Sequence, residues 1–212
     1  MQFAVITGPT FDVAKRRIKL ASQKKDGIEL RLDLFKDKID AENVKSLLDI
    51  NAQRTILTLR KRSHGGGYLG REDIRQETIL KLLETSPSYV DIESDTHQSF
   101  LERVNQTFPS IKIISSTHNY AVTPRDLEKT FNNMRNDYAY AYKICTTANS
   151  FADAYKMLRF IHKKTAEGLR IIGICMGEYG KITRREGIKA GNYLNYSILH
   201  NRDNCAPGLH LA

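Results

Sequence analysis

The 212-residue sequence lacks tryptophan and contains only three cysteines and five prolines. Cys145, Cys175 and Cys205 do not have the paired spacing of metal-binding motifs, so we expect reduced thiols in a cytoplasmic protein without a bound metal. No apolar run approaches the ~20 residues that a membrane span needs. No basic segment precedes the apolar N-terminal residues, which argues against a signal peptide.

Acidic residues are fewer than basic ones, and the formal net charge is +9. Such an excess fits either nucleic acid or an anionic small molecule as ligand. The basic residues are scattered in small groups, and the sequence contains no RNA-binding signature and no zinc-finger spacing. We therefore expect most of this charge to lie on the solvated surface and the partner to be an anionic small molecule, with no nucleic acid or membrane involved.

Short apolar segments alternate with helical patterns along the whole chain, without a linker or low-complexity segment. This alternation predicts parallel βαβ units and favours a single-domain (β/α)8 barrel, a TIM barrel, over residues 1–212. The alternative is an open doubly wound sheet, but no G-x-G-x-x-G follows the first strand, so no dinucleotide cofactor is expected. The predicted strands are 3–7, 28–34, 54–60, 89–93, 111–115, 137–145, 170–176 and 193–199. The predicted helices are 12–24, 41–50, 71–84, one around Phe100, one beginning at Thr123-Pro124 and one capped by Ser150.

Lys143 interrupts an otherwise apolar and aromatic segment, 137–145, which reads DYAYAYKIC. A lysine in a buried strand either extends its stem to water or loses its hydration. Loss of hydration would lower its pKa, and the neutral amine could then form a Schiff base with a ketone. Both interpretations are open from this segment alone.

Polar residues gather where a barrel would place an active site, at the C-terminal ends of its strands. They could form salt bridges at the rim, yet their convergence from so many strands favours a functional site. They are Glu29, Arg31, Arg60, Asp91, Glu93, His118 and Lys143, with Arg184 after the seventh strand.

Seven short motifs follow one another along the chain. They are 28–33 (IELRLD), 58–60 (TLR), 90–93 (VDIE), 116–119 (STHN), 142–144 (YKI), Met176-Gly177 with Thr183-Arg184, and 206–208 (APG). In this order they resemble the motifs of type I 3-dehydroquinate dehydratase, and the match extends from about residue 3 to residue 209. The resemblance implies a cytoplasmic hydro-lyase of the shikimate pathway that converts 3-dehydroquinate to 3-dehydroshikimate without a cofactor. A homodimer is compatible with it.

The same resemblance implies roles for individual residues. Lys143 would form the Schiff base, His118 would act as general acid and base, and Arg184 would bind the substrate carboxylate. An imidazole suits proton transfer because its ordinary pKa lies near neutral pH. The ring hydroxyls would be held by Glu29, Arg31 and Arg60, with Asp91 and Glu93 as supporting carboxylates.

The sequence departs from the family pattern at several positions. His64 stands where the family has a glutamate that orients the catalytic histidine, Leu209 replaces a glutamine, and Cys205 replaces a serine. The closing helix of the family is missing after Ala212. The chain could therefore be a segment of a longer polypeptide, since a shikimate dehydrogenase domain follows in some members.

Two other functions remain compatible with the residues. Another Schiff-base barrel enzyme, similar to a class I aldolase, would share Lys143 but would not need His118 or Arg184. A catalytically impaired barrel that only binds a ligand, or whose basic surface binds nucleic acid, is the second alternative. Retro-aldol activity would indicate the first, and salt-sensitive binding to DNA would indicate the second.

Overall fold

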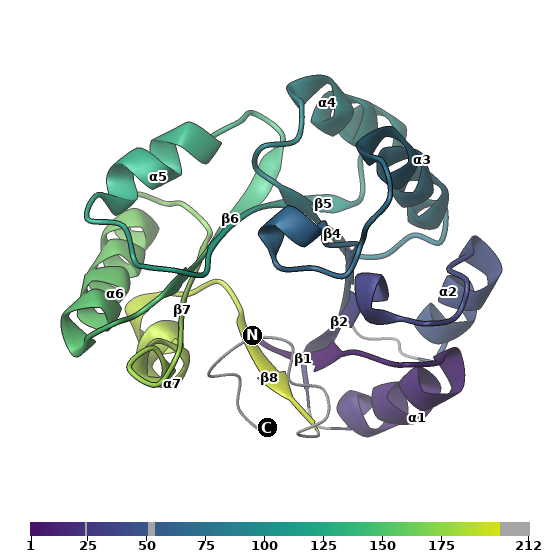
Figure 1. Cartoon of the computed structure of the whole chain (residues 1–212), viewed down its shortest axis with the longest axis horizontal. Coiled ribbons are helices and arrows are strands. Elements are labelled where there is room, and N and C mark those ends of the chain that lie inside the picture. The colour runs from purple at the N-terminus through teal and green to yellow at the C-terminus, as the bar shows by residue number, and fades with distance from the viewer. Residues whose placement is uncertain (24, 51–53, 200–212) are drawn as a thin grey trace.

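The computed structural model describes residues 1–23, 25–50 and 54–199, which form a (β/α)8 barrel with the strands inside and the helices around them (Figure 1). The fold predicted from the alternating pattern is thus confirmed. The strands are β1 (Gln2–Ile6), β2 (Gly27–Arg31), β3 (Arg54–Thr58), β4 (Tyr89–Glu93), β5 (Lys112–Asn119), β6 (Ala139–Thr147), β7 (Ile171–Met176) and β8 (Asn195–Ile198). The helices are α1 (Phe11–Ser22), α2 (Ala41–Leu48), α3 (Glu72–Leu83), α4 (Gln98–Thr107), α5 (Leu127–Met134), α6 (Phe151–Ala166) and α7 (Lys181–Ala190), with short 3-10 turns η1 (Leu32–Leu34) and η2 (Arg62–His64).

The strands pair in parallel in the order β7-β6-β5-β4-β3-β2-β1-β8. In the part of the chain that the structure describes, no strand ladder joins β7 to β8. The side chain of Asn192 bridges this junction, because its Oδ1 accepts from the Gly173 N–H at 2.8 Å and its Nδ2 donates to the Gly173 carbonyl at 3.0 Å. The Tyr193 N–H also donates to the Ile171 carbonyl at 2.8 Å. A side-chain amide therefore replaces strand pairing where the ring closes.

The twofold periodicity of the strands separates two apolar cores. In β2, Ile28 and Leu30 belong to the core between the sheet and the helices, so Glu29 and Arg31 point to the barrel interior. The interior itself contains an apolar cluster that includes Phe3, Ile56, Tyr89, Ile114 and Ile172. Tyr89 precedes Asp91 and Glu93 on β4, and Ile56 on β3 precedes Arg60. The interior is therefore apolar toward the N-terminal ends of the strands and charged toward their C-terminal ends.

The second strand is shorter than predicted. It ends at Arg31, and the residues predicted to continue it form the 3-10 turn η1. Asp33 explains the change, since its carboxylate accepts from Arg31 Nε at 2.9 Å and Nη2 at 2.8 Å and from the Gly67 N–H at 2.9 Å. If the strand continued, Arg31 and Asp33 would lie on the same face, but the Asp33 carboxylate would not be in position to accept from the Gly67 N–H.

The helix predicted to begin at Thr123-Pro124 begins instead at Leu127, with Asp126 as its N-cap. The Asp126 carboxylate accepts from the Lys129 N–H at 2.8 Å. The Thr123 hydroxyl is buried, donates to the Thr147 carbonyl at 2.9 Å and contacts the Thr146 hydroxyl at 2.8 Å. Thr123 was therefore wrongly predicted as a cap, because its hydroxyl is used in a tertiary contact with β6.

None of the described helices has the length and apolar character needed to cross a membrane.

Candidate active site

A pocket that is partly open to solvent lies at the C-terminal end of the barrel. Every strand except β3 and β4 contributes a residue directly, and Arg60 enters from the loop after β3. The wall combines charged, aromatic and apolar side chains. The lining residues are Val5, Glu29, Arg31, Arg60, His118, Tyr120, Lys143, Cys145, Ile174, Met176, Arg184 and Tyr196.

Lys143 lies in this pocket with its side chain only 6% exposed. Its Nζ is 2.9 Å from Asp91 Oδ2, 3.2 Å from Glu29 Oε1 and 4.2 Å from the centroid of the Tyr196 ring. Burial alone would lower the pKa of Lys143, but Asp91 and Glu29 outweigh it and hold that pKa well above its ordinary value. The lowered pKa that loss of hydration would give is therefore not what these surroundings produce, because the segment around Lys143 did not show that Glu29 and Asp91 contact its amine.

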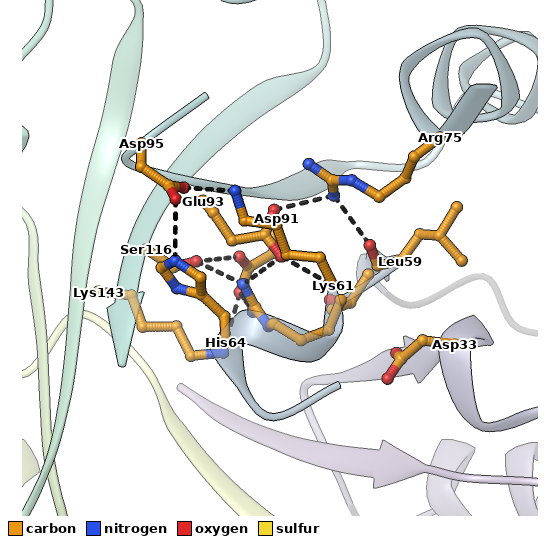
Figure 2. A network of polar contacts seen from close by, with 12 residues as sticks. Asp33, Leu59, Lys61, His64, Arg75, Asp91, Glu93, Asp95, Ser116 and Lys143 are labelled. Carbon is orange, nitrogen blue, oxygen red and sulfur yellow. Dashed lines mark hydrogen bonds and ion pairs between the residues drawn. The ribbon is translucent and has the colours of Figure 1, made fainter. Parts of the chain in front are cut away.

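Asp91 connects Lys143 to a buried guanidinium (Figure 2). Arg60 Nη2 is 2.8 Å from Asp91 Oδ2, and the Ser116 hydroxyl donates to Asp91 Oδ1 at 2.6 Å. Burial would raise the pKa of Asp91, but Arg60 and Lys143 lower it far below its ordinary value. Glu93 contacts Arg60 at 3.3 Å and does not reach Lys143. Of the two predicted supporting carboxylates, Asp91 therefore supports Lys143, whereas Glu93 supports Arg60.

His118 enters the pocket from β5, at the position paired with Cys145 of β6. Among the described residues, no hydrogen-bond partner reaches its buried Nδ1. Burial, followed by the positive charges of Arg60 and Lys143, lowers the pKa of His118 well below its ordinary value. The imidazole is therefore neutral at pH 7 and can accept a proton.

His64 belongs to the glycine-rich loop that lies beside His118. The two rings meet edge to face, with centroids 6.1 Å apart, and His64 Nε2 is 3.2 Å from Asp95 Oδ2. Gly65 adopts a left-handed conformation (φ 73°), and a Cβ on Gly66 would lie 2.0 Å from the Arg60 carbonyl oxygen. The glycines therefore allow the loop to fold closely over Arg60 and place His64 next to His118.

Arg184 reaches the pocket from the first turn of α7. The turn before this helix includes Gly177, whose left-handed backbone (φ 82°) suits glycine. The neighbouring Thr183 hydroxyl accepts from the Cys175 N–H at 2.9 Å and donates to the Gly180 carbonyl at 2.7 Å, which fixes the start of α7 against β7. Arg184 thus joins Arg31 and Arg60, and their three guanidinium groups make the pocket suited to an anionic ligand.

A family model for type I 3-dehydroquinase matches residues 2–211. The chain belongs to the type I 3-dehydroquinase family. The resemblance seen in the motifs is therefore confirmed, and so is the enzyme class that it implied, a hydro-lyase.

Curated relatives of the chain agree with its assignment to the 3-dehydroquinase family. The 3-dehydroquinate dehydratase of Methanopyrus kandleri is 30% identical over 211 residues, which cover 98% of this chain and 93% of the relative. The bifunctional 3-dehydroquinate dehydratase/shikimate dehydrogenase of Arabidopsis thaliana is 32% identical over 186 residues, which cover 86% of this chain. The chain spans only 30% of the length of that bifunctional relative.

Solved structures of other proteins share the barrel fold of this chain. The 3-dehydroquinate dehydratase of Aquifex aeolicus superimposes with a TM-score of 0.81 at 28% identity and covers 100% of this chain and 93% of its own. The enzyme of Geobacillus kaustophilus gives a TM-score of 0.86 at 21% identity, covering 99% of this chain and 86% of its own, and so shows the common fold.

The structure brings together most of the site residues that the family motifs indicated. Glu29, Arg31, Arg60, His118, Lys143 and Arg184 line one pocket, and Asp91, Glu93 and His64 lie directly behind it. Leu209 and Cys205 lie outside the described residues. Within those residues, no group of three or more His, Cys, Asp or Glu side chains is arranged to hold a metal ion.

Sequence reasoning missed Ser116, Arg75, Tyr120 and Tyr196. Ser116 could have been found from its spacing, because it lies two residues before His118 on the same strand and therefore on the same face. Arg75 carried no signal, since a charged residue in a helical pattern is ordinarily assigned to the solvent-exposed face.

Proposed function

We propose that the chain dehydrates 3-dehydroquinate to 3-dehydroshikimate through a Schiff base on Lys143, with His118 as general acid and base. The observation that supports this most directly is the placement of Lys143. Its ammonium contacts two carboxylates inside a pocket that also holds a neutral imidazole and three guanidinium groups. A ketone that carries a carboxylate matches this set of groups.

The raised pKa of Lys143 is compatible with Schiff-base chemistry because the charge at nitrogen is the same before and after the reaction. The ammonium loses a proton, the amine forms a bond to the ketone carbon, and water leaves to give a protonated iminium. Asp91 and Glu29 stabilise the positive charge in both states. Only the transient neutral amine is disfavoured, and His118, neutral in the same pocket, can accept its proton.

Once the iminium has formed, His118 removes a proton from the adjacent carbon, and the electrons of that C–H bond move to the iminium nitrogen to give an enamine. The imidazolium then returns a proton to the departing hydroxyl, which leaves as water. Addition of water to the iminium releases the product and restores Lys143. One histidine serves both proton transfers because its neutral form is the resting state.

The arginines would hold the substrate around this centre. Arg184 is proposed to bind the carboxylate, because a guanidinium can make two parallel hydrogen bonds to it. Arg31, Arg60 and Glu29 are proposed to contact the ring hydroxyls. Arg31 is fixed by Asp33 at 2.8 Å and Arg60 by Asp91 at 2.8 Å, so both are held in place before substrate binds.

His64 is proposed to restrain the ring of His118 from the side. Its own ring is held by Asp95, which also pairs with Lys61 at 2.7 Å. The positive charge that His64 carries when protonated would further disfavour protonation of His118. On this proposal, His64 would take the place of the family glutamate with a different chemistry.

Borohydride reduction during turnover tests the proposal. The iminium is reducible, so the protein should lose activity and gain the mass of the reduced adduct on the peptide that contains Lys143. Lys143→Ala should abolish both labelling and dehydration. His118→Ala should still be labelled but dehydrate slowly, because the covalent step survives while proton transfer is lost.

Lys164→Ala is the matched control, since Lys164 is also buried and paired with carboxylates but lies on α6, away from the pocket. It should be labelled like the wild type. An adduct on another lysine, or dehydration without any adduct, would contradict the mechanism. Retro-aldol cleavage by the same preparation would favour the aldolase alternative.

A further inference from the structure

A row of alternating charges passes from α3, outside the barrel, to Lys143 inside it. Its outer end is Arg75, whose Nη1 is 2.8 Å from Glu93 Oε2. Glu93 Oε1 is 3.3 Å from Arg60 Nη1, and Arg60 Nη2 is 2.8 Å from Asp91 Oδ2. Asp91 Oδ2 is in turn 2.9 Å from Lys143 Nζ. The side chains of Arg75, Glu93 and Asp91 have no exposed area, and those of Arg60 and Lys143 are 3% and 6% exposed.

Arg75 is unusual because it is a fully buried arginine on a helix that does not line the pocket. Figure 2 shows its guanidinium reaching toward Glu93 and the Leu59 carbonyl. It donates to the Leu59 oxygen at 2.9 Å and to the two oxygens of Glu72 at 2.8 and 2.7 Å. Glu72 is 42% exposed, so Glu93 is the partner that Arg75 neutralises inside the protein.

Among the buried side chains around Lys143 the charges balance when Arg75 is included, and Glu72, which is 42% exposed, adds a partly solvated carboxylate at the outer end of the row. Three cations, Arg75, Arg60 and Lys143, face three carboxylates, Glu93, Asp91 and Glu29. Arg31 and Asp33 form a separate, self-neutralising pair. Without Arg75 the cluster would carry an excess negative charge in a region where water does not screen it.

We propose that Arg75 is a positioning residue for the Schiff-base reaction, which acts through Glu93, Arg60 and Asp91 to set how readily Lys143 becomes a neutral amine. This inference rests on the proposed function of Lys143. Arg75 does not touch the pocket, so it is not a catalytic residue. The positive charge of Arg75 offsets the negative charge of Glu93, so the charge of Arg60 is left to offset that of Asp91. Asp91 therefore binds the Lys143 ammonium less strongly than it would without Arg60.

The expected direction follows from electrostatics. Removing a cation from the buried cluster favours every remaining positive charge, and Lys143 then holds its proton more strongly. Other charged or titratable groups face Lys143 from the neighbouring elements and would be unchanged in the variants. They are Glu29 on β2, Arg60 after β3, Asp91 on β4, His118 on β5, Cys145 on β6, Arg184 on α7 and Tyr196 on β8.

The test measures the rate of borohydride labelling at saturating 3-dehydroquinate, as a function of pH, in Arg75→Met and Arg75→Lys. In Arg75→Met, borohydride should label Lys143 about three- to tenfold more slowly at a given pH. This corresponds to a shift of the pH–rate curve by about half to one pH unit, so raising the pH by that amount should restore the rate. Arg75→Lys keeps the charge, so its labelling rate should be close to that of the wild type. Both variants should be less stable, because each loses the forked contacts to Glu72 and Leu59.

Two further variants separate charge from stability. Glu72→Gln removes a carboxylate from the outer end of the row and should change the labelling rate in the opposite direction, toward faster labelling. Arg103→Met is the matched control, because Arg103 pairs with Glu77 of α3 at 2.7 Å but is exposed and outside the row.

A purely structural role for Arg75 predicts lower stability in Arg75→Met and Arg75→Lys with unchanged labelling in both, and this result would overturn the inference. If Arg75→Met does not fold, Glu72→Gln still decides between these outcomes, because only the charge effect predicts faster labelling in that variant. Failure of the wild type to form an adduct on Lys143 would instead refute the proposed function itself.

Discussion

His118 lies among more positive than negative groups, and this determines its protonation state. Burial and the neighbouring Arg60 and Lys143 lower its pKa well below the ordinary value of 6.5. A histidine must be neutral to act as a general base, so a lowered pKa extends the pH range in which it can act to lower pH. We therefore expect the acid limb of kcat to have its midpoint below pH 6.5.

The measurement is kcat at saturating substrate between pH 4 and 8, where formation of the complex does not limit the rate. His97→Gln serves as a control because His97 contacts Ser99 at the start of α4 and lies outside the pocket. It should leave the acid limb unchanged. A midpoint at or above pH 6.5 in the wild type would show that the described surroundings of His118 do not govern its titration.

Individual residues show where sequence reasoning ends. Lys143 and His118 could be placed in one pocket from the barrel rule, because the sequence predicts both near the C-terminal ends of strands. The charge state of Lys143 could not be predicted, since it depends on Asp91 and Glu29, which are 52 and 114 residues away in the chain. Only the register of the strands brings these carboxylates to the amine.

At the scale of the elements, the closure between β7 and β8 depends on Asn192. Its amide satisfies both backbone groups of Gly173, and a Cβ on Gly187 would lie 2.6 Å from its Nδ2, so glycine at that position leaves room for the amide. Asn192→Ala should lower the free energy of unfolding by about 2–5 kcal/mol, because two buried backbone groups would lose their partners. Urea unfolding at pH 7 measures this loss.

Asn43→Ala is the comparison for this prediction. Asn43 also bonds through its side chain, donating to Asp40 at 2.9 Å, but it is exposed. Its loss should change the free energy of unfolding by less than about 0.5 kcal/mol. Equal effects of the two alanine substitutions would mean that Asn192 does not hold the β7–β8 junction.

The elements themselves were largely predictable, and two of the errors have a common cause. The number and order of strands followed from apolar segments that alternate with helical patterns. Helix α7 was not predicted, and β5 extends to Asn119 where the prediction ended it at 115. Two further errors, the end of β2 and the start of α5, both involve a polar side chain used in tertiary contact, Asp33 with the loop at Gly67 and Thr123 with β6. Local propensity could not show these contacts, because their partners lie 34 and 24 residues away.

For the whole molecule, burying ionisable groups makes stability depend on pH. The folded-state pKa of Asp91 is lowered below its ordinary value, so Asp91 stabilises the fold above about pH 3.9 and loses this effect as the pH falls toward its folded pKa. The pKa of His118 is also lowered. The unfolded chain therefore binds a proton at this histidine below about pH 6.5 while the folded protein does not, and stability falls there as well.

These two groups predict an acid decline in two stages. The free energy of unfolding should begin to fall near pH 6.5, by up to about 1.4 kcal/mol per pH unit from His118, and should fall more steeply below about pH 4 when Asp91 contributes. Urea unfolding at pH 7, 6, 5 and 4 would show this for the wild type and for His118→Gln. The variant lacks the titrating imidazole, so its stability should decline less between pH 7 and pH 5, whereas its decline below pH 4 should persist because Asp91 is intact. Parallel curves for the two proteins between pH 7 and pH 5 would mean that His118 has the same pKa in the folded and unfolded states, so that burial and the neighbouring cations do not lower it.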